Sequence, residues 1–243
     1  GDTEQAIKNL RKAVELKPDD HELNFLLGGT LTQSGDFNAA IESLEQALKL
    51  KPDYAEACFS MASALTAKGD LDGAIDSYKQ AIKIKPDYAE AYNNMALVLN
   101  DLNYFDAAIE SFKLALMIDP KSYSAYNNMG IALHDKGEPD AAIISYKKAL
   151  KIKPDYTDAY NNMGRSLNNK GDFDAAIDSY KRAIKLKPDY ADTYFNFGYA
   201  LNEKGDQEAA IKSYKKALKL KPDYAEAYKN MGAALMDKGD PDA

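Results

Sequence analysis

The sequence predicts an all-α protein built from stacked antiparallel helical hairpins, the architecture called an α-solenoid. Seven prolines recur at intervals of 34 residues: Pro18, Pro52, Pro86, Pro120, Pro154, Pro188 and Pro222. Fourteen of the 17 tyrosines fall on three positions of the same period. Each period also contains two stretches with apolar residues at helical spacing. A fixed period of this length in a helical pattern is the signature of a repeat protein.

The prolines divide the chain into repeats that each begin 31 residues before the proline. We interpret residues 1–243 as a single array. Its six full repeats are 21–54, 55–88, 89–122, 123–156, 157–190 and 191–224. Residues 1–20 correspond to the second half of an earlier repeat, and residues 225–243 to the first half of a later one. Positions that correspond in successive repeats are said below to share a phase.

The fifth repeat shows how two helices are expected in each unit. Residues 157–170 carry Tyr160, Met163 and Leu167, and residues 173–186 carry Ala176, Ile177, Tyr180, Ala183 and Ile184. Each set forms one stripe on a helix. Gly171 is expected to end the first helix in the left-handed conformation, and Asp172 to cap the second.

Prolines mark the helix boundaries in two ways. The recurring Lys-Pro-Asp-Tyr segment ends each repeat, because proline cannot continue a helix and restricts the residue before it. Pro139 and Pro241 fall instead at the first turn of a second helix, where a missing N–H costs little.

Two phases hold only small residues, and we expect them to let two helix backbones approach closely. The first-helix phase consists of Gly28, Ala62, Ala96, Gly130, Gly164, Gly198 and Gly232. The second-helix phase consists of Ala6, Ala40, Ala74, Ala108, Ala142, Ala176 and Ala210.

These phases resemble the tetratricopeptide repeat family. In the fifth repeat the family pattern is Tyr160, Met163-Gly164, Leu167, Ala176, Tyr180, Ala183 and Pro188. The resemblance implies a right-handed superhelix in which first helices line a concave groove and second helices form the convex back. The third repeat departs most, because Asn103 replaces the turn glycine and Asp119-Pro120-Lys121-Ser122 replaces Lys-Pro-Asp-Tyr. Asparagine tolerates the left-handed conformation, so we expect the fold to persist there.

One phase of the first helix holds an asparagine stripe, which consists of Asn94, Asn128, Asn162, Asn196 and Asn230. It resembles the asparagine ladder of O-linked N-acetylglucosamine transferases, which implies a groove that grips the backbone of an extended peptide. A carboxamide offers a donor and an acceptor, as a peptide unit does. It can therefore bind the main chain of a peptide whatever side chains the peptide carries. The alternative is that asparagine merely suits an exposed helical position, and the sequence leaves both open.

Other first-helix phases are expected to complete a peptide-binding groove. The phase before the stripe supplies Phe25, Phe59, Asn93, Asn127, Asn161 and Phe195, and an acidic phase supplies Glu56, Glu90, Asp158, Asp192 and Glu226. An acidic groove favours a neutral or basic peptide. The alternative is a solvated charged surface, which is our interpretation of the lysines on the second helices.

Several classes of function are not expected. A net charge of −7 disfavours nucleic-acid binding. No apolar stretch is long enough to insert into a membrane. The two histidines, His21 and His134, are far apart and have no Cys or His at ligand spacing, so we expect no metal. With no nucleophile elbow or phosphate loop, we expect no enzyme activity and no cofactor. The lone cysteine, Cys58, cannot form an internal disulfide, so a cytoplasmic protein is the expectation.

Three functions remain: a peptide- or protein-binding scaffold, the substrate-recognition arm of a larger enzyme such as a glycosyltransferase, and a self-assembling scaffold. A clamp for the C-terminal carboxylate of heat-shock proteins is not expected, since Arg165 and Lys229 are isolated at the relevant phases. The chain lacks an initial Met and its end helices lack polar caps, so we expect a segment of a longer protein. Such ends could associate head to tail.

Overall fold

The computed structural model describes residues 1–239, and the role expected for Pro241 lies outside the described residues. Within the described part, the chain forms fourteen helices and no strand, which confirms the all-α prediction. They are α1 (Asp2–Leu16), α2 (His21–Ser34), α3 (Phe37–Leu50), α4 (Ala55–Lys68), α5 (Leu71–Ile84), α6 (Ala89–Asp101), α7 (Phe105–Ile118), α8 (Tyr123–Asp135), α9 (Pro139–Ile152), α10 (Thr157–Asn169), α11 (Phe173–Leu186), α12 (Ala191–Glu203), α13 (Gln207–Leu220) and α14 (Ala225–Asp237).

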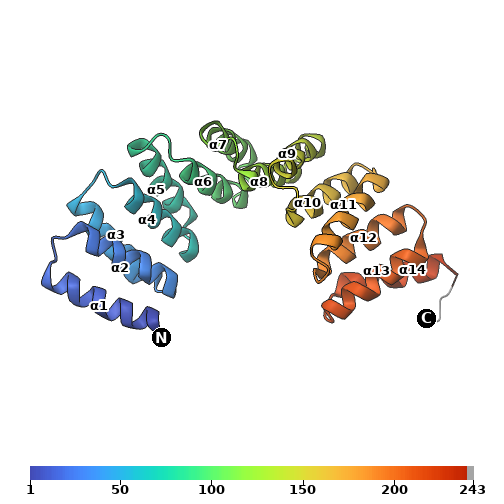
Figure 1. Ribbon diagram of the computed structural model, residues 1–243, viewed down its shortest axis with the longest axis horizontal. Helices are drawn as coiled ribbons and strands as arrows, with labels where there is room; N and C mark the ends of the chain where they lie inside the picture. Colours follow the sequence, from blue (N-terminus) through green and yellow to red (C-terminus); the bar gives the residue numbers. More distant parts are fainter. Residues whose placement is uncertain (240–243) are drawn as a thin grey trace. The chain divides into compact units, whose positions relative to one another are not determined.

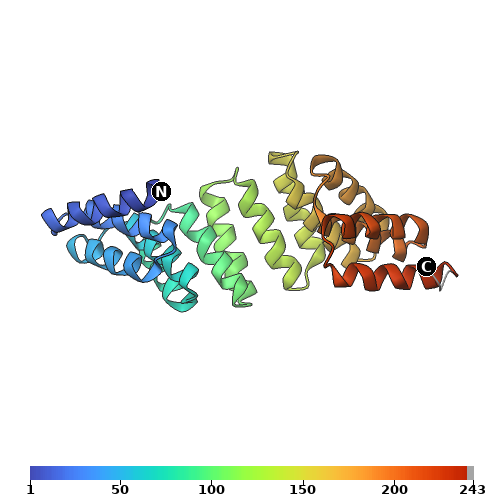
Figure 2. The same ribbon diagram turned by 90° about the horizontal axis from the view of Figure 1, so that it is seen from below.

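Two compact blocks make up the chain, Gly1–Pro120 with α1–α7 and Lys121–Ala243 with α8–α14. The hairpins are α2–α3, α4–α5 and α6–α7 in the N-terminal block, and α8–α9, α10–α11 and α12–α13 in the C-terminal block. Within each block, the second helix of one hairpin packs against the first helix of the next (Figures 1 and 2). In the C-terminal block the first helices α8, α10, α12 and α14 also contact one another in succession.

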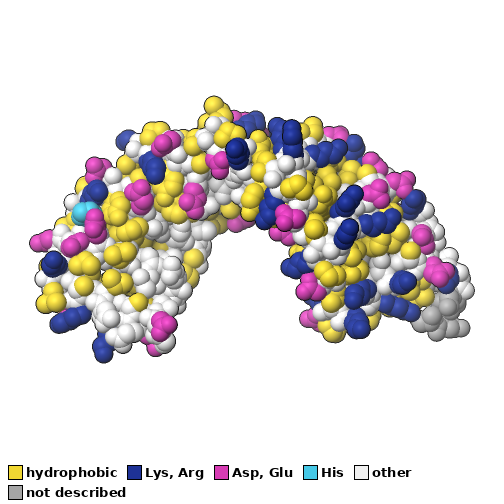
Figure 3. Space-filling model, in the orientation of Figure 1, with side chains coloured by type: hydrophobic (Ala, Val, Ile, Leu, Met, Phe, Trp, Pro, Cys, Tyr) yellow, Lys and Arg dark blue, Asp and Glu magenta, His cyan; other side chains and the backbone are white. Residues whose placement is uncertain are grey.

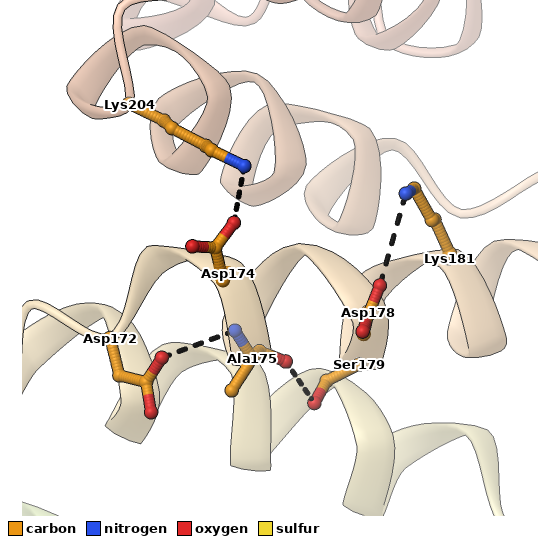
Figure 4. A network of polar contacts seen from close by, with 7 residues as sticks. All are labelled: Asp172, Asp174, Ala175, Asp178, Ser179, Lys181 and Lys204. Carbon is orange, nitrogen blue, oxygen red and sulfur yellow. Dashed lines mark hydrogen bonds and ion pairs between the residues drawn. The ribbon is translucent and has the colours of Figure 1, made fainter.

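The turns between helices have the chemistry that the sequence predicts. Gly171 adopts φ 77° after α10, and Asn103 adopts φ 62° at the corresponding turn of the third repeat. The side chain of Asp172 accepts a hydrogen bond from the Ala175 amide at 3.2 Å and so caps α11 (Figure 4). Pro139 occupies the first turn of α9. Lys187, which precedes Pro188, leaves helical geometry at φ −137° and ends α11.

At three glycines of the small first-helix phase, Gly130, Gly164 and Gly198, the close neighbour is an aromatic ring of the second helix rather than its backbone, which differs from the expected approach of two backbones. At Gly28 an added Cβ would meet Leu44 and, at 3.1 Å, the carbonyl oxygen of Ala40. A Cβ placed on Gly130 would lie 2.5 Å from the ring of Tyr146, and one on Gly164 would lie 2.6 Å from Tyr180. Both tyrosines are fully buried. In contrast, the small residues of α3, α5, α7, α9, α11 and α13, such as Ala176, have no exposed surface and mark the tightly packed core of each hairpin.

Two glycines, one within α2 and one directly after it, are expected to respond in opposite directions to substitution by alanine. Gly35 has φ 86°, where a Cβ is strained, so Gly35→Ala should lower the free energy of unfolding by roughly 1–2 kcal/mol. Gly29 lies inside the helix with open space around it, so Gly29→Ala should raise that free energy by about 0.5–1 kcal/mol. Urea unfolding followed by circular dichroism measures both changes. A stabilising Gly35→Ala would contradict the assigned turn.

Candidate functional site

The asparagine stripe lies on successive first helices, and each of its side chains is half-buried. Asn128, Asn162, Asn196 and Asn230 lie on α8, α10, α12 and α14 of the C-terminal block. Asn94 lies on α6 of the N-terminal block, where the same phase is otherwise Leu26 and Ser60. The longest run of carboxamides is therefore contained in one block, on helices that contact one another in order.

Some of the stripe's hydrogen-bonding capacity is used within the protein. Asn162 Nδ2 of the fifth repeat donates to Asn127 Oδ1 of the fourth at 3.1 Å, and Asn127 Nδ2 donates to Asn128 Oδ1 at 3.4 Å. The side chain of Asn230 lies close to the hydroxyl of Tyr214. Within residues 1–239, Asn128 Nδ2, Asn162 Oδ1 and the whole carboxamide of Asn196 form no hydrogen bond. The stripe is thus held in place and still presents free donors and acceptors.

The asparagines that precede the stripe lie beneath it rather than on the groove surface where the sequence analysis placed them. Asn127 and Asn161 are only 3% and 7% exposed, and Asn93 is half-buried. Asn93 Nδ2 donates to Asn94 Oδ1 at 3.1 Å, as Asn127 does to its stripe neighbour. Asn93 and Asn127 therefore orient their neighbours in the stripe. Direct contact of Asn127 and Asn161 with a peptide is limited by their burial.

The three phenylalanines of that phase pack against the tyrosine that ends their own repeat. Ring centroids are 4.9 Å apart for Phe25 and Tyr54, 5.1 Å for Phe59 and Tyr88, and 4.9 Å for Phe195 and Tyr224. All three phenylalanines are half-buried. From the sequence, these tyrosines are expected only to end each repeat within the Lys-Pro-Asp-Tyr segment. Their shared phase was the signal that could have linked them to the site.

The acidic phase lies beside the same tyrosines. Glu56, Glu90, Asp158 and Glu226 are exposed and Asp192 is half-buried. Burial, followed by the charges of Glu90 and Glu56, raises the pKa of Tyr88 to about 12. Burial also raises the pKa of Tyr190, with Asp192 and Asp158 adding to the rise. Each tyrosine thus lies between carboxylates of successive repeats.

Lysines of the Lys-Pro-Asp-Tyr segments reduce the negative charge of the acidic phase near these tyrosines. Lys85 Nζ lies 4.7 Å from the ring centroid of Tyr88 and 3.6 Å from Glu56 Oε1. Lys187 and Lys221 lie over Tyr190 and Tyr224 at 5.0 and 4.5 Å. In the part that the structure describes, Asp158 and Asp192 form no ion pair, so the acidic character persists in the C-terminal block.

His134 belongs to a first-helix phase that the sequence analysis did not include in the site. Its Nδ1 lies 2.8 Å from Ser166 Oγ, and its Nε2 lies 3.5 Å from Asn169 Nδ2. Ser166 is fully buried, so its bond with His134 links two repeats and the cluster offers no accessible nucleophile. Burial lowers the pKa of His134, and Arg165 lowers it further against the opposing effect of Asp135.

Three further features of the described residues bear on function: possible metal sites, possible membrane-spanning helices and the single cysteine. Residues 1–239 contain no cluster of three or more His, Cys, Asp or Glu side chains that could hold a metal ion. None of the described helices is long and apolar enough to cross a membrane. Cys58 is 1% exposed, as expected for a packing residue.

The lowered pKa of His134 predicts a pH-dependent contribution to stability. As pH falls below 6.5, the unfolded chain takes up a proton that the folded chain resists, so the free energy of unfolding decreases. The His134→Asn variant, which introduces the residue found at this phase in α6, α10 and α12, should lose this component. Urea unfolding from about pH 7.5 to about pH 5.5 measures it. Parallel curves for the two proteins would contradict the prediction.

Comparison with protein families identifies the repeat along most of the chain. Family models described as TPR repeat match residues 28–65, 62–103, 164–205 and 198–239. Models described as tetratricopeptide repeat match residues 1–20, 89–122, 123–156 and 145–178. No curated protein sequence matches the chain.

Solved structures include relatives with the same repeat architecture. MamA is 32% identical, with a TM-score of 0.63 over 68% of this chain and 97% of MamA. YrrB, described as a TPR protein with an unusual peptide-binding site, is 23% identical, with a TM-score of 0.64 over 78% of this chain and 97% of YrrB. The C-terminal part of a TPR repeat-containing protein from Cytophaga hutchinsonii is 17% identical, with a TM-score of 0.76 over 95% of each chain. The last two likenesses concern the fold alone. The recurring phases, the hairpins and the family matches together show that the chain belongs to the tetratricopeptide repeat family.

Proposed function

We propose that the chain is a protein-interaction scaffold that binds an extended peptide along the asparagine stripe of the C-terminal block. The observation that carries this proposal is the run of four half-buried asparagines on helices that contact one another in succession. Buried neighbours orient part of the run, and unpaired carboxamide groups remain on it. An oriented carboxamide loses less conformational freedom on binding than a mobile one.

The chemistry of the stripe favours recognition of main chain. An extended peptide presents N–H and C=O groups along its length, and each asparagine can pair with one of either kind. Recognition would therefore depend more on the extended shape and backbone groups of the peptide than on its side chains. YrrB, described as having an unusual peptide-binding site, supports the use of this repeat for peptides.

The charges beside the stripe favour a neutral or basic peptide. Asp158 and Asp192 lie on α10 and α12 and have no cationic partner among the described residues. A lysine or arginine of the ligand would meet complementary charge there, which chiefly raises the association rate and the specificity. The same site would serve the substrate-recognition arm of a larger enzyme, because such an arm also holds an extended chain.

Replacing three stripe residues tests this site. The combination Asn128→Ala, Asn162→Ala and Asn196→Ala should weaken binding by at least about tenfold, since each lost hydrogen bond contributes about 0.5–1.5 kcal/mol. The ligand is an unstructured peptide selected against the intact chain from a random-sequence phage library. Fluorescence anisotropy measures the affinity, and circular dichroism checks that the helix content is retained.

The matched control replaces three exposed lysines of the second helices, Lys147, Lys151 and Lys185, with alanine. This control should keep the affinity of the intact chain. If the asparagine variant binds the selected peptide as tightly as the intact chain does, the stripe is not the binding site.

A further inference from the structure

A hollow of about 750 Å³ lies between α11, α12 and α13 in the C-terminal block. Its apolar floor is formed by Tyr194, Phe197 and Leu201 of α12, together with Ala209 of α13. No residue of the asparagine stripe lines it. Tyr194 and Phe197 are half-buried, so their rings are partly accessible at the bottom of the hollow. The hollow is therefore a second concave surface, separate from the proposed peptide site.

Lysines surround this apolar floor. They are Lys181 of α11 and Lys212, Lys215, Lys216 and Lys219 of α13. Figure 3 shows Lys and Arg side chains beside hydrophobic ones over this part of the surface. The one carboxylate of the lining, Asp206, accepts a hydrogen bond from the Ala209 amide at 3.0 Å and caps α13. Its charge is directed at the helix N-terminus, where it is stabilised.

The lysines of α13 lack the ion pairs that lysines of α5, α7 and α11 make. Lys79 pairs with Asp76 at 3.4 Å, Lys113 with Glu110 at 2.6 Å, and Lys181 with Asp178 at 3.8 Å. Figure 4 shows the last pair, beside the ion pair of Lys204 with Asp174. Lys212 stands at the phase of these acids, so Lys215 has no such partner. Within the described residues, the four lysines of α13 that line the hollow form no ion pair.

The sixth repeat departs from the others at two positions of this hollow. Phe197 stands where the second to fifth repeats have Met61, Met95, Met129 and Met163. Lys212 stands where the first, second, third and fifth full repeats have Glu42, Asp76, Glu110 and Asp178. One change enlarges the aromatic floor and the other reverses a charge at the rim. Lys212 and Lys216 are four residues apart on α13, where like charges destabilise a helix by about 0.2–0.5 kcal/mol.

We propose that this hollow is a docking site for an acidic amphipathic helix of a partner protein. The apolar face of such a helix would cover Tyr194 and Phe197, in the helix-in-groove mode. Its carboxylates would pair with Lys212, Lys215, Lys216 and Lys219 and relieve their mutual repulsion. The partner at this site is acidic and helical, whereas the asparagine stripe fits an extended peptide that is neutral or basic.

The probe is a synthetic helical peptide with leucines on one face and glutamates on the other. The combination Phe197→Met and Lys212→Asp introduces the residues that the fifth repeat carries at these phases, Met163 and Asp178. This variant should fold like the intact chain and bind the probe about tenfold more weakly in fluorescence anisotropy. Binding to the intact chain should weaken with added salt, because the contacts are partly ionic.

The matched control is Lys79→Asp, which makes the same change of charge on an exposed position of α5. It should bind the probe within about twofold of the intact chain. The proposal is overturned if the control weakens binding as much as the double variant, if a scrambled peptide of the same composition binds equally, or if the intact chain does not bind the probe. It is also overturned if vesicles containing phosphatidylserine, and not the peptide, show the dependence on Lys212. The double variant should bind the peptide selected for the asparagine stripe as tightly as the intact chain does. The two proposed binding sites are therefore tested independently of each other.

Discussion

Each hairpin of the C-terminal block depends on an aromatic ring of the second helix that packs against a glycine of the first. Tyr146, Tyr180 and Tyr214 occupy this position and are almost fully buried. Their rings cross the hairpin so far that the hydroxyls reach polar groups of first helices, namely Ser166, Asn168 and Asn230. Burial raises the pKa of all three tyrosines, so they remain neutral hydrogen-bonding groups. The packing that closes the hairpin therefore also brings these hydroxyls to polar residues of the first helices.

This arrangement explains why the asparagine stripe is ordered by the repeat itself. The Asn162 amide donates a hydrogen bond to Asn127, two helices earlier along the chain, and Asn230 lies close to the hydroxyl of Tyr214 in the preceding hairpin. A contact that stacks one repeat on the next also fixes the direction of a carboxamide. Stability in such arrays is a sum of repeat and nearest-neighbour terms. The binding face and the neighbour interface consequently share residues, and a substitution such as Asn162→Ala affects both.

The periodicity of the sequence was sufficient for the helices and turns, since it depends on local chemistry. The expected starts at Thr157 and Ala191 match α10 and α12, and Gly171 and Asn103 adopt the left-handed turns. It was not sufficient to decide which of two adjacent asparagines faces outward. Consecutive helical residues point about 100° apart, and only the packing of the next repeat shows that Asn127 is covered while Asn128 is not. The position of Tyr88 between the charges of Glu56 and Glu90, which belong to two repeats, was missed for the same reason.

Regular and irregular phases carry different information in a repeat protein. A residue type that recurs at one phase, such as the buried alanine of the second helices, meets the same neighbours in every repeat and is explained by stacking. A residue that departs from its phase cannot be explained in that way, because the stack forms without it elsewhere in the chain. Phe197 and Lys212 depart together and line one hollow, and Lys212 leaves the lysines of α13 without the ion pairs of α5, α7 and α11. Exposed apolar surface next to uncompensated charge is costly to keep, and a complementary partner removes both costs at once.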